Sequence, residues 1–326
     1  MDSLLAELSE DANPRSILQL AKAYKKHLKK EERYWAQRHF TVIINNLEAF
    51  IARKHKPDQI GQISAAWIED FQDFLLNELH TDKRGNPIGG NSNNTVRKKL
   101  QRLKGFTDWL LKQEEIDTDP YRQVDRVKAK KVNSKVKLSY QQVQTLQALS
   151  LEPYSKEWNA RNFFLYSFYN AGIRFGDLCC LKWSNLIDGR LVYTMNKTGK
   201  PKSIKQLAPM RRILNHYRND KEQPEAYIFP ILSGPFDDPM ALRKQISREN
   251  VKVNKRLKNL AKKAGIQANI SFHVSRHSFA QYALREGMDL YAISKALGHA
   301  DLKITEEYIK SFDEELLDQS MGDLFE

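Results

Sequence analysis

The hydrophobic residues in the first third of the chain recur at helical spacing. Between positions 40 and 51, six of them share one face of a helix with about 3.6 residues per turn: Phe40, Ile43, Ile44, Leu47, Phe50 and Ile51. Similar patterns run near 17–28, 67–79 and 96–111, and a loop rich in Gly, Pro and Asn at 85–94 precedes the last of them. The pattern predicts four amphipathic helices that bury their apolar faces in a small bundle.

A second helical region begins near position 139. Ser139 and Gln142 have the spacing of a capping box just ahead of an apolar run, which predicts the start of a helix. Helical spacing then dominates except at 189–207, where two short apolar runs flank a group of turn-forming residues. This stretch predicts a strand, a turn and a second strand. We therefore expect a mostly α fold with a small β-sheet.

Basic residues exceed acidic ones, and two segments are especially rich in them. The chain has 326 residues, with 53 Lys and Arg against 40 Asp and Glu and a formal net charge of +13, which favours a polyanionic partner. Seven basic residues and one acid lie between 121 and 137, and nine basic residues and one acid lie between 242 and 263. The first segment can be a solvated spacer, but its place between two domains favours contact with a DNA backbone.

The composition excludes several other classes of protein. No stretch approaches the roughly 20 apolar residues of a membrane helix, and the first eleven residues are acidic where a secretion signal is basic. The two cysteines, Cys179 and Cys180, are adjacent, so they form neither a disulfide framework nor a Cys-based zinc site. We expect a protein of the reducing cytoplasm.

The most specific chemical pattern lies in the last third of the chain. On a helix, positions 273, 276 and 277 share one face. Two histidines four residues apart also occur in zinc sites, but Arg276 between them would repel the ion, so we favour a bound phosphate, which a guanidinium grips through two oxygens. The pattern reads His273-Val274-Ser275-Arg276-His277, then Leu297-Gly298-His299, then Tyr308.

This combination resembles the tyrosine recombinases, the family of the phage integrases and of the Xer and Cre proteins. Its members have an Arg early in the catalytic domain, a Lys in a hairpin, an H-x-x-R-H box, an L-G-H box and a Tyr nine residues after the last His. All five parts occur in order across 138–312, and Asp177 stands where many members carry Glu. The first two parts are Arg174 in Ala171-Gly172-Ile173-Arg174-Phe175-Gly176-Asp177-Leu178, and Lys197 in Asn196-Lys197-Thr198-Gly199-Lys200.

The resemblance implies a set of catalytic residues, with neither cofactor nor metal. Tyr308 is the expected nucleophile and forms a 3′-phosphotyrosyl link, and Lys197 is the expected general acid, with Lys200 as the alternative. His277 is expected to support the fold, with direct chemistry as the alternative. The implied catalytic set is Arg174, Lys197, His273, Arg276, His299 and Tyr308.

The resemblance also implies two lobes that close as a clamp around a DNA duplex. The short N-terminal flank resembles the compact members, which lack an additional arm-binding domain. The expected domains are a flank at 1–14, a helical core-binding domain at 15–113, a basic linker at 114–137, a catalytic domain at 138–311 and an acidic tail at 312–326.

The expected partners follow from the same resemblance. They are double-stranded DNA with inverted-repeat recombination sites and the other subunits of a homo-tetramer in the synaptic complex, without a membrane or a small-molecule substrate. The protein is expected to associate with the nucleoid. The tail carries six acids and no base, with apolar residues near helical spacing, so we expect it to avoid DNA and to dock on a neighbouring subunit, or alternatively on its own domain.

Two other functions fit a related set of residues. A type IB topoisomerase would use the same residue types to relax supercoils as a monomer, without selecting a DNA sequence. A non-catalytic DNA-binding accessory protein descended from a recombinase would have lost a catalytic residue, and none of the set is missing here. The sequence therefore favours a site-specific recombinase.

Overall fold

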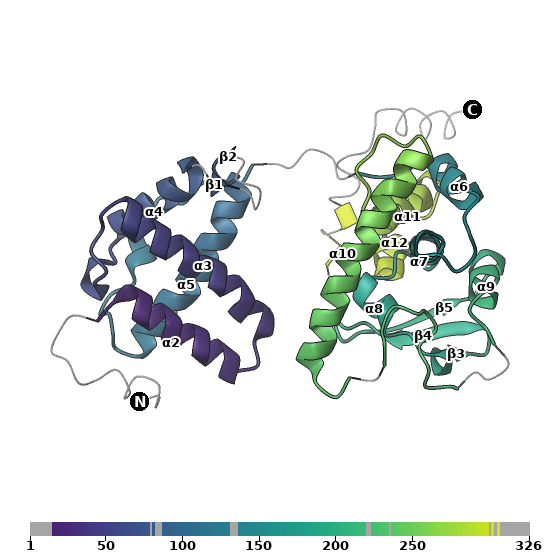
Figure 1. The fold of residues 1–326 in the computed structure, drawn as a ribbon, viewed down its shortest axis with the longest axis horizontal. Helices are drawn as coiled ribbons and strands as arrows, with labels where there is room; N and C mark the ends of the chain where they lie inside the picture. Colours follow the sequence, from purple (N-terminus) through teal and green to yellow (C-terminus); the bar gives the residue numbers. More distant parts are fainter. Residues whose placement is uncertain are drawn as a thin grey trace. The chain divides into compact units, whose positions relative to one another are not determined.

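The chain divides into two compact units, residues 1–132 and residues 133–326 (Figure 1). The computed structural model describes residues 15–78, 80–81, 87–130, 136–219, 223–234, 236–299, 301–302 and 305–306. Tyr308 and the tail at 312–326 lie outside the described residues, so what the sequence predicts for them stays a prediction.

The described part of the first unit is a bundle of four helices, as the hydrophobic pattern predicts. Side-chain oxygens of Ser16, Ser64 and Ser92 cap the N-termini of three of them. The apolar faces meet in one core that includes Phe40 and Phe106. The helices are α2 (Ile17–Lys30), α3 (Tyr34–Arg53), α4 (Ala65–Asn77) and α5 (Asn93–Lys112), with a 3₁₀ turn η1 (Ile60–Gln62) between α3 and α4.

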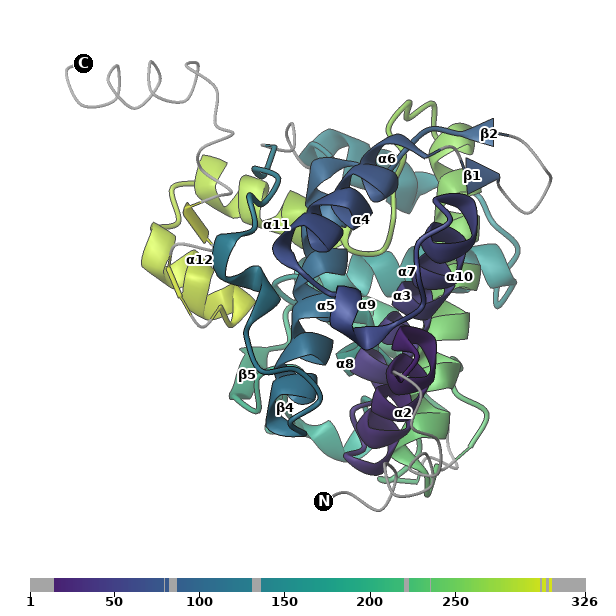
Figure 2. The same cartoon turned by 90° about the vertical axis from the view of Figure 1, so that its left-hand side faces the viewer.

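Between α4 and α5 the chain forms a hairpin of β1 (His80–Thr81) and β2 (Pro87–Ile88), seen beyond the bundle in Figure 2. The sequence predicted only a loop for 85–94. Strands of two residues are too short to leave the alternating pattern by which a strand is recognised.

The basic segment that follows α5 lies against the first unit as far as it is described. It begins with a 3₁₀ turn, η2 (Pro120–Gln123), and Gln72 on α4 then holds it by bonds to the backbone of Asp125 and Val127. The amides of Asn93 and Asn94 donate to the carbonyls of the segment's residues 128 and 130. These bonds fix the backbone of the segment up to residue 130.

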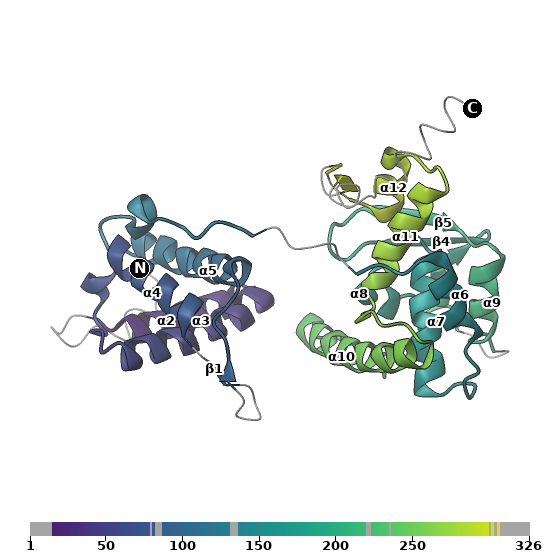
Figure 3. The same ribbon diagram turned by 90° about the horizontal axis from the view of Figure 1, so that it is seen from above.

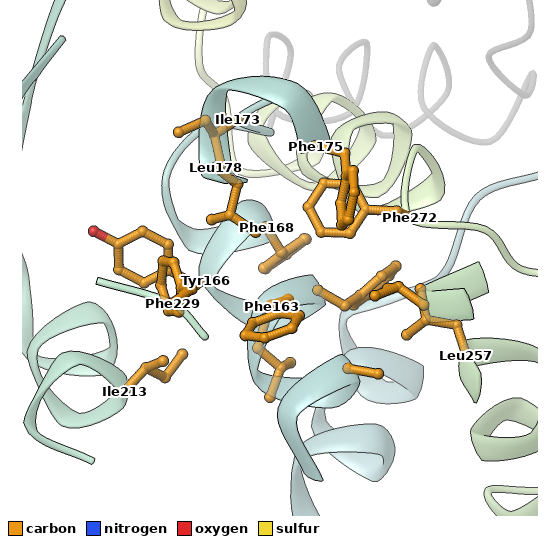
Figure 4. Packing of buried hydrophobic residues seen from close by; sticks show 14 of the residues in the cluster. Phe163, Tyr166, Phe168, Ile173, Phe175, Leu178, Ile213, Phe229, Leu257 and Phe272 are labelled. Carbon is orange, nitrogen blue, oxygen red and sulfur yellow. The ribbon is translucent and has the colours of Figure 1, made fainter. Parts of the chain in front are cut away.

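The second unit is built around α7 (Lys156–Tyr169), seen end-on at its centre in Figure 1. Figure 4 shows Phe163, Tyr166 and Phe168 of this helix within the core, with Phe229 packed against Tyr166. The helices that contact α7 are α6 (Tyr140–Ala148), α8 (Phe175–Cys179), α9 (Ala208–Asn215), α10 (Pro239–Lys263) and α11 (Val274–Arg285).

Two further features of the second unit frame the site. The helix α12 (Leu290–Leu297) lies beside α11 (Figure 3). The antiparallel sheet has the order β3–β4–β5 and includes the predicted hairpin, together with a two-residue strand that the sequence did not predict. The strands are β3 (Leu186–Ile187), β4 (Arg190–Thr194) and β5 (Pro201–Lys205), and a 3₁₀ turn, η3 (Trp183–Asn185), precedes them. The unit is mainly helical, as predicted.

Candidate active site

The turn between α7 and α8 brings Arg174 and Arg276 into one site. Gly172 has φ +66°, a left-handed conformation that favours glycine, and a Cβ atom there would lie 2.6 Å from Cγ of Arg276. The guanidinium of Arg276 donates to the Gly172 carbonyl at 2.8 Å and to the Leu297 carbonyl at 2.6 Å. Arg276 is buried, and its orientation is set by two segments that are far apart in the sequence.

A second set of hydrogen bonds joins α11 to the turn that carries Arg174. The hydroxyls of Ser167 and Ser275 are 2.7 Å apart, and Ser167 also donates to the Ile173 carbonyl at 2.9 Å. Phe175 and Phe272 pack edge to face beside this link, with ring centroids 5.0 Å apart. Arg174 is thus held at the N-cap of α8 by its neighbours on both sides.

Met195, at the end of β4, lies between Arg174 and the L-G-H box. A guanidinium nitrogen of Arg174 is 3.4 Å from its sulfur, and a Cβ atom on Gly298 would lie 2.5 Å from its terminal methyl. Gly298 ends α12 with φ +67°. This left-handed cap turns the chain so that His299 follows α12 at the site, where its Nδ1 lies 2.7 Å from the hydroxyl of the buried Thr305.

The two histidines of the H-x-x-R-H box occupy different environments. His273 is exposed at the N-cap of α11, whereas His277 is buried one turn later. Their rings meet edge to face with centroids 4.6 Å apart. The exposure of His273 suits contact with a ligand, and the burial of His277 suits the supporting role that the sequence predicted for it.

Lys197 and Lys200 both lie exposed in the turn between β4 and β5. The turn is closed by the Met195 N–H, which donates to the Lys200 carbonyl at 3.0 Å. It is tied to α8 by the Asn196 N–H, which donates to Oδ1 of Asp177 at 2.8 Å. Lys197 therefore follows directly after the residue that fixes the turn to the helix of Arg174.

Beneath the two arginines lies a group of buried polar residues that sequence reasoning missed as part of the site. Burial, then the charges of Arg276 and Arg174, lower the pKa of Lys202 to about 7. Burial raises the pKa of Asp177, against the opposing effect of its bond from Asn196 and of the nearby cations. The phenol of Tyr193 is buried in the same group.

The pattern of residues along the sequence indicated only in part that these side chains are buried near the site. Lys202 alternates with exposed residues on a predicted strand, but alternation does not reveal which face of the strand is buried. The serine pair, Ser167 and Ser275, left no signal, because each looks like an ordinary helical serine.

Each unit also carries a basic surface of its own. On α10, eight of the nine Lys and Arg of 242–263 are exposed, and the ninth, Arg256, is half-buried. On the first unit, a groove of about 640 Å³ lies along α5, and the Arg126 guanidinium stacks 5.2 Å from the centroid of the Tyr121 ring at its edge. The groove is lined by Asn94, Arg97, Lys98, Leu100, Gln101, Lys104, Tyr121 and Arg126.

In the part of the chain that the structure describes, no three His, Cys, Asp or Glu side chains are grouped in a way that could hold a metal ion. None of the helices in this part combines the length and the apolar character needed to cross a membrane.

Comparison of sequences relates both units to known proteins. Residues 137–315 match the phage integrase family, and residues 16–132 match the phage integrase SAM-like domain. Tyrosine recombinase XerC of Xanthomonas campestris pv. campestris is 26% identical over 269 residues, covering 82% of this chain and 79% of that protein. Tyrosine recombinase XerD of Rickettsia bellii is 26% identical over 266 residues, covering 73% of this chain and 84% of that protein.

Comparison of structures gives related folds. The XerH site-specific recombinase in a post-cleavage complex with a palindromic difH substrate aligns with a TM-score of 0.65 and 17% identity, covering 99% of this chain and 88% of that one. A lambda integrase dimer bound to a COC′ core site aligns with a TM-score of 0.60 and 17% identity, covering 89% of this chain and 97% of that one. At such identities the likeness shows the fold.

Proposed function

The chain belongs to the phage integrase family and is a site-specific DNA recombinase of the tyrosine type, and we propose that it cuts DNA with Tyr308 while Arg174 and Arg276 hold the scissile phosphate. One observation carries this proposal. The turn before α8, the end of β4 and the end of α12 converge on the two arginines, with His299 and the turn of Lys197 beside them.

The arginines suit the charge that develops on a reacting phosphodiester. Its pentacoordinate transition state carries an additional negative charge, and donors that are already oriented stabilise that state without reorganising. Arg276 is oriented before DNA arrives, because two backbone carbonyls hold its guanidinium. In our proposal His273 and His299 add hydrogen bonds to the nonbridging oxygens.

The remaining roles concern the two oxygens that exchange at phosphorus. A free tyrosine has a pKa of about 10, so the attack by Tyr308 depends on the cations around it. Tyr308 gives up its phenolic proton to solvent as its oxygen bonds to phosphorus. The bond to the 5′ oxygen breaks, and Lys197 protonates that oxygen, which leaves as a hydroxyl. The phosphotyrosyl link keeps the energy of the phosphodiester, so a 5′ hydroxyl can reverse the step without a nucleotide cofactor.

We assign the DNA backbone to the basic surfaces, which are α10 on the second unit and the groove along α5 on the first. Lysines and arginines that neutralise phosphates supply most of the sequence-independent affinity for DNA. A lambda integrase tetramer bound to a Holliday junction is among the related folds, with a TM-score of 0.61. We propose by analogy that this chain acts as a homo-tetramer on duplexes with inverted-repeat sites.

The proposal is tested by Tyr308→Phe, which removes only the nucleophilic oxygen. We expect this variant to bind a recombination-site duplex within about twofold of the wild type and to form no covalent adduct, since the other contacts to DNA are unchanged. The measurement is a nicked suicide duplex resolved on a denaturing gel, with a gel shift for binding. Tyr291→Phe is the matched control, because Tyr291 is exposed on α12 and has no assigned role. A covalent band of normal intensity from Tyr308→Phe would refute the assignment of Tyr308 as the nucleophile.

A further inference from the structure

Lys202 is a lysine that the fold turns inward. It pairs with Tyr193 across the β4–β5 ladder, and directly paired residues lie on the same face of a sheet, here the buried one. Lys202 is 9% exposed, whereas Lys205 on the same strand is exposed. Lysines are rarely buried without a charged partner, so the neighbours of Lys202 are informative.

The charged and titratable groups around Lys202 come from three elements. Arg174 and Asp177 belong to the start of α8, Arg276 to α11 and Tyr193 to β4. The two guanidiniums oppose a third positive charge, while Asp177 favours one. In the absence of DNA, burial and then the charges of Arg276 and Arg174 lower the pKa of Lys202 to about 7, where an ordinary lysine has 10.5.

Asp177 has room for one more bond. Its Oδ1 accepts the Asn196 N–H at 2.8 Å, but its buried Oδ2 has no hydrogen-bond partner among the described residues. An ammonium group on Lys202 would supply the missing donor. The resulting chain from Lys202 through Asp177 to Asn196 would reach the turn that carries Lys197.

A bound phosphate changes the charge balance of this group. Its negative charge offsets the two guanidiniums that hold it, and a nearby opposite charge favours the protonated form of an amine. We propose that Lys202 is a positioning residue that takes up one proton from solvent when a DNA phosphate enters the site, and that its ammonium then bonds Oδ2 of Asp177 and steadies the turn of Lys197. The inference rests on the proposed function, since it needs a phosphate at Arg174 and Arg276.

The direction of the pH dependence follows from the two states. Below about pH 7 Lys202 is already protonated in the free protein, so DNA binding takes up no proton there. Above pH 7 the free protein has the neutral amine and the complex the ammonium, so binding takes up a proton. DNA affinity therefore falls as the pH rises from 7 toward the higher pKa of the complex.

The proton count on binding tests this inference directly. Isothermal titration calorimetry near pH 8 compares two buffers of different ionisation enthalpy, Tris and HEPES. The protein carries Tyr308→Phe so that the DNA stays uncut, and the probe is a duplex enriched from a random library by repeated binding to the wild-type chain. We expect the parent to take up roughly 0.5 to 1 proton per subunit, from the shift of a single amine. Lys202→Met in this background should lose that uptake, and Lys205→Met, the exposed control on β5, should keep it.

A second readout separates positioning from a merely structural role. With Tyr308 present, Lys202→Met should slow adduct formation about tenfold on the normal duplex. It should slow it much less on a duplex with sulfur at the bridging 5′ position, because a thiolate leaves without the proton from Lys197. An equal loss on both duplexes would overturn the role in positioning.

The calorimetry has its own contrary outcomes. The inference is overturned if the parent takes up no proton near pH 8, or if Lys202→Met keeps the uptake. The first outcome is decided on the parent alone, so it does not depend on the folding of a variant. Failure of the wild-type chain to form an adduct would refute the proposed function instead, and the proton count would remain a separate result.

Discussion

At the scale of single residues, Arg276 shows why this site uses arginine. Its guanidinium donates to the carbonyls of Gly172 and Leu297 and, in our proposal, to a phosphate as well. A guanidinium has five N–H donors in a rigid plane, whereas an ammonium has three on a freely rotating head. Arginine can therefore join two segments of the protein and still hold a substrate.

Lys197 and Lys200 are the two candidates for the general acid. Both are exposed in one turn, so burial does not distinguish them, but only Lys197 adjoins the Asn196 N–H that is bound by Asp177. We expect Lys197→Ala to reduce cleavage of a normal duplex by about 10² to 10⁴ and to recover when sulfur replaces the bridging 5′ oxygen, because the leaving thiolate needs no proton.

The measurement is the rate of adduct formation on the two duplexes, with Lys200→Ala as the matched control from the same turn. Lys200→Ala should lose little on either duplex. If sulfur rescued Lys200→Ala and left Lys197→Ala inactive, the two assignments would be exchanged.

At the scale of elements, the turn between α7 and α8 determines where the first arginine lies. Ala171 and Gly172 both have positive φ, and the turn brings the Gly172 carbonyl to Arg276. The Gly172 N–H returns to the Ser167 carbonyl of α7 at 2.8 Å. The turn thus ends α7 and leads into α8, and its Gly172 carbonyl accepts a hydrogen bond from Arg276 of α11.

We expect Gly172→Ala to damage both stability and activity. The new Cβ atom would lie 2.6 Å from Arg276 Cγ and 2.7 Å from its Cα, in addition to the strain of φ +66°. The free energy of unfolding should fall by about 2 to 4 kcal/mol, the sum of overpacking and backbone strain. Urea unfolding measures this loss, and the suicide duplex measures the accompanying loss of adduct.

The matched control is Gly189→Ala. Gly189 has φ +70° but open space around the position of its Cβ atom, so only the strain of about 1 kcal/mol remains. If the two variants lost the same free energy of unfolding, the contact of the new Cβ atom with Arg276 would not be the cause of the loss at Gly172.

At the scale of the whole molecule, the chain has two units with separate cores and a formal net charge of +13. The core of the first unit is formed by α2 to α5, and that of the second surrounds α7. Each unit has its own basic surface, and in our proposal each of these surfaces contacts the DNA backbone. The acidic residues at 312–326 have the opposite charge, which favours a role in assembly rather than in DNA binding.

We expect truncation after Ser311 to separate these two roles. Binding to a single site should remain within about threefold of the full chain, because the acidic tail adds no attraction to DNA. Synapsis and strand exchange should be lost, since the apolar face of the tail would no longer dock on a neighbouring subunit. A gel shift and a strand-exchange assay on the same preparation measure both.

Normal recombination by the truncated protein would refute docking on a neighbour. Loss of single-site binding together with loss of folding would place the tail in the fold of its own subunit.

By itself, the sequence determined the local structure and the residues of the motifs. Spacing and caps predicted the four helices of the first unit, the start of α6 at Ser139 and the β4–β5 hairpin, because these depend on residues close together in the chain. The order of the five motifs indicated the family. The roles of Lys197 and Tyr308 stay predictions.

Only the tertiary structure decided which of these residues are buried together. His273 and His277 were predicted on one face of a helix, yet one is exposed and the other buried, because packing around the helix and not its period decides what covers each turn. The inward position of Lys202, the open Oδ2 of Asp177 and the bond between Ser167 and Ser275 depend on contacts between distant segments. Local spacing carries no information about such contacts, so the polar group beneath the arginines became visible only in the folded chain.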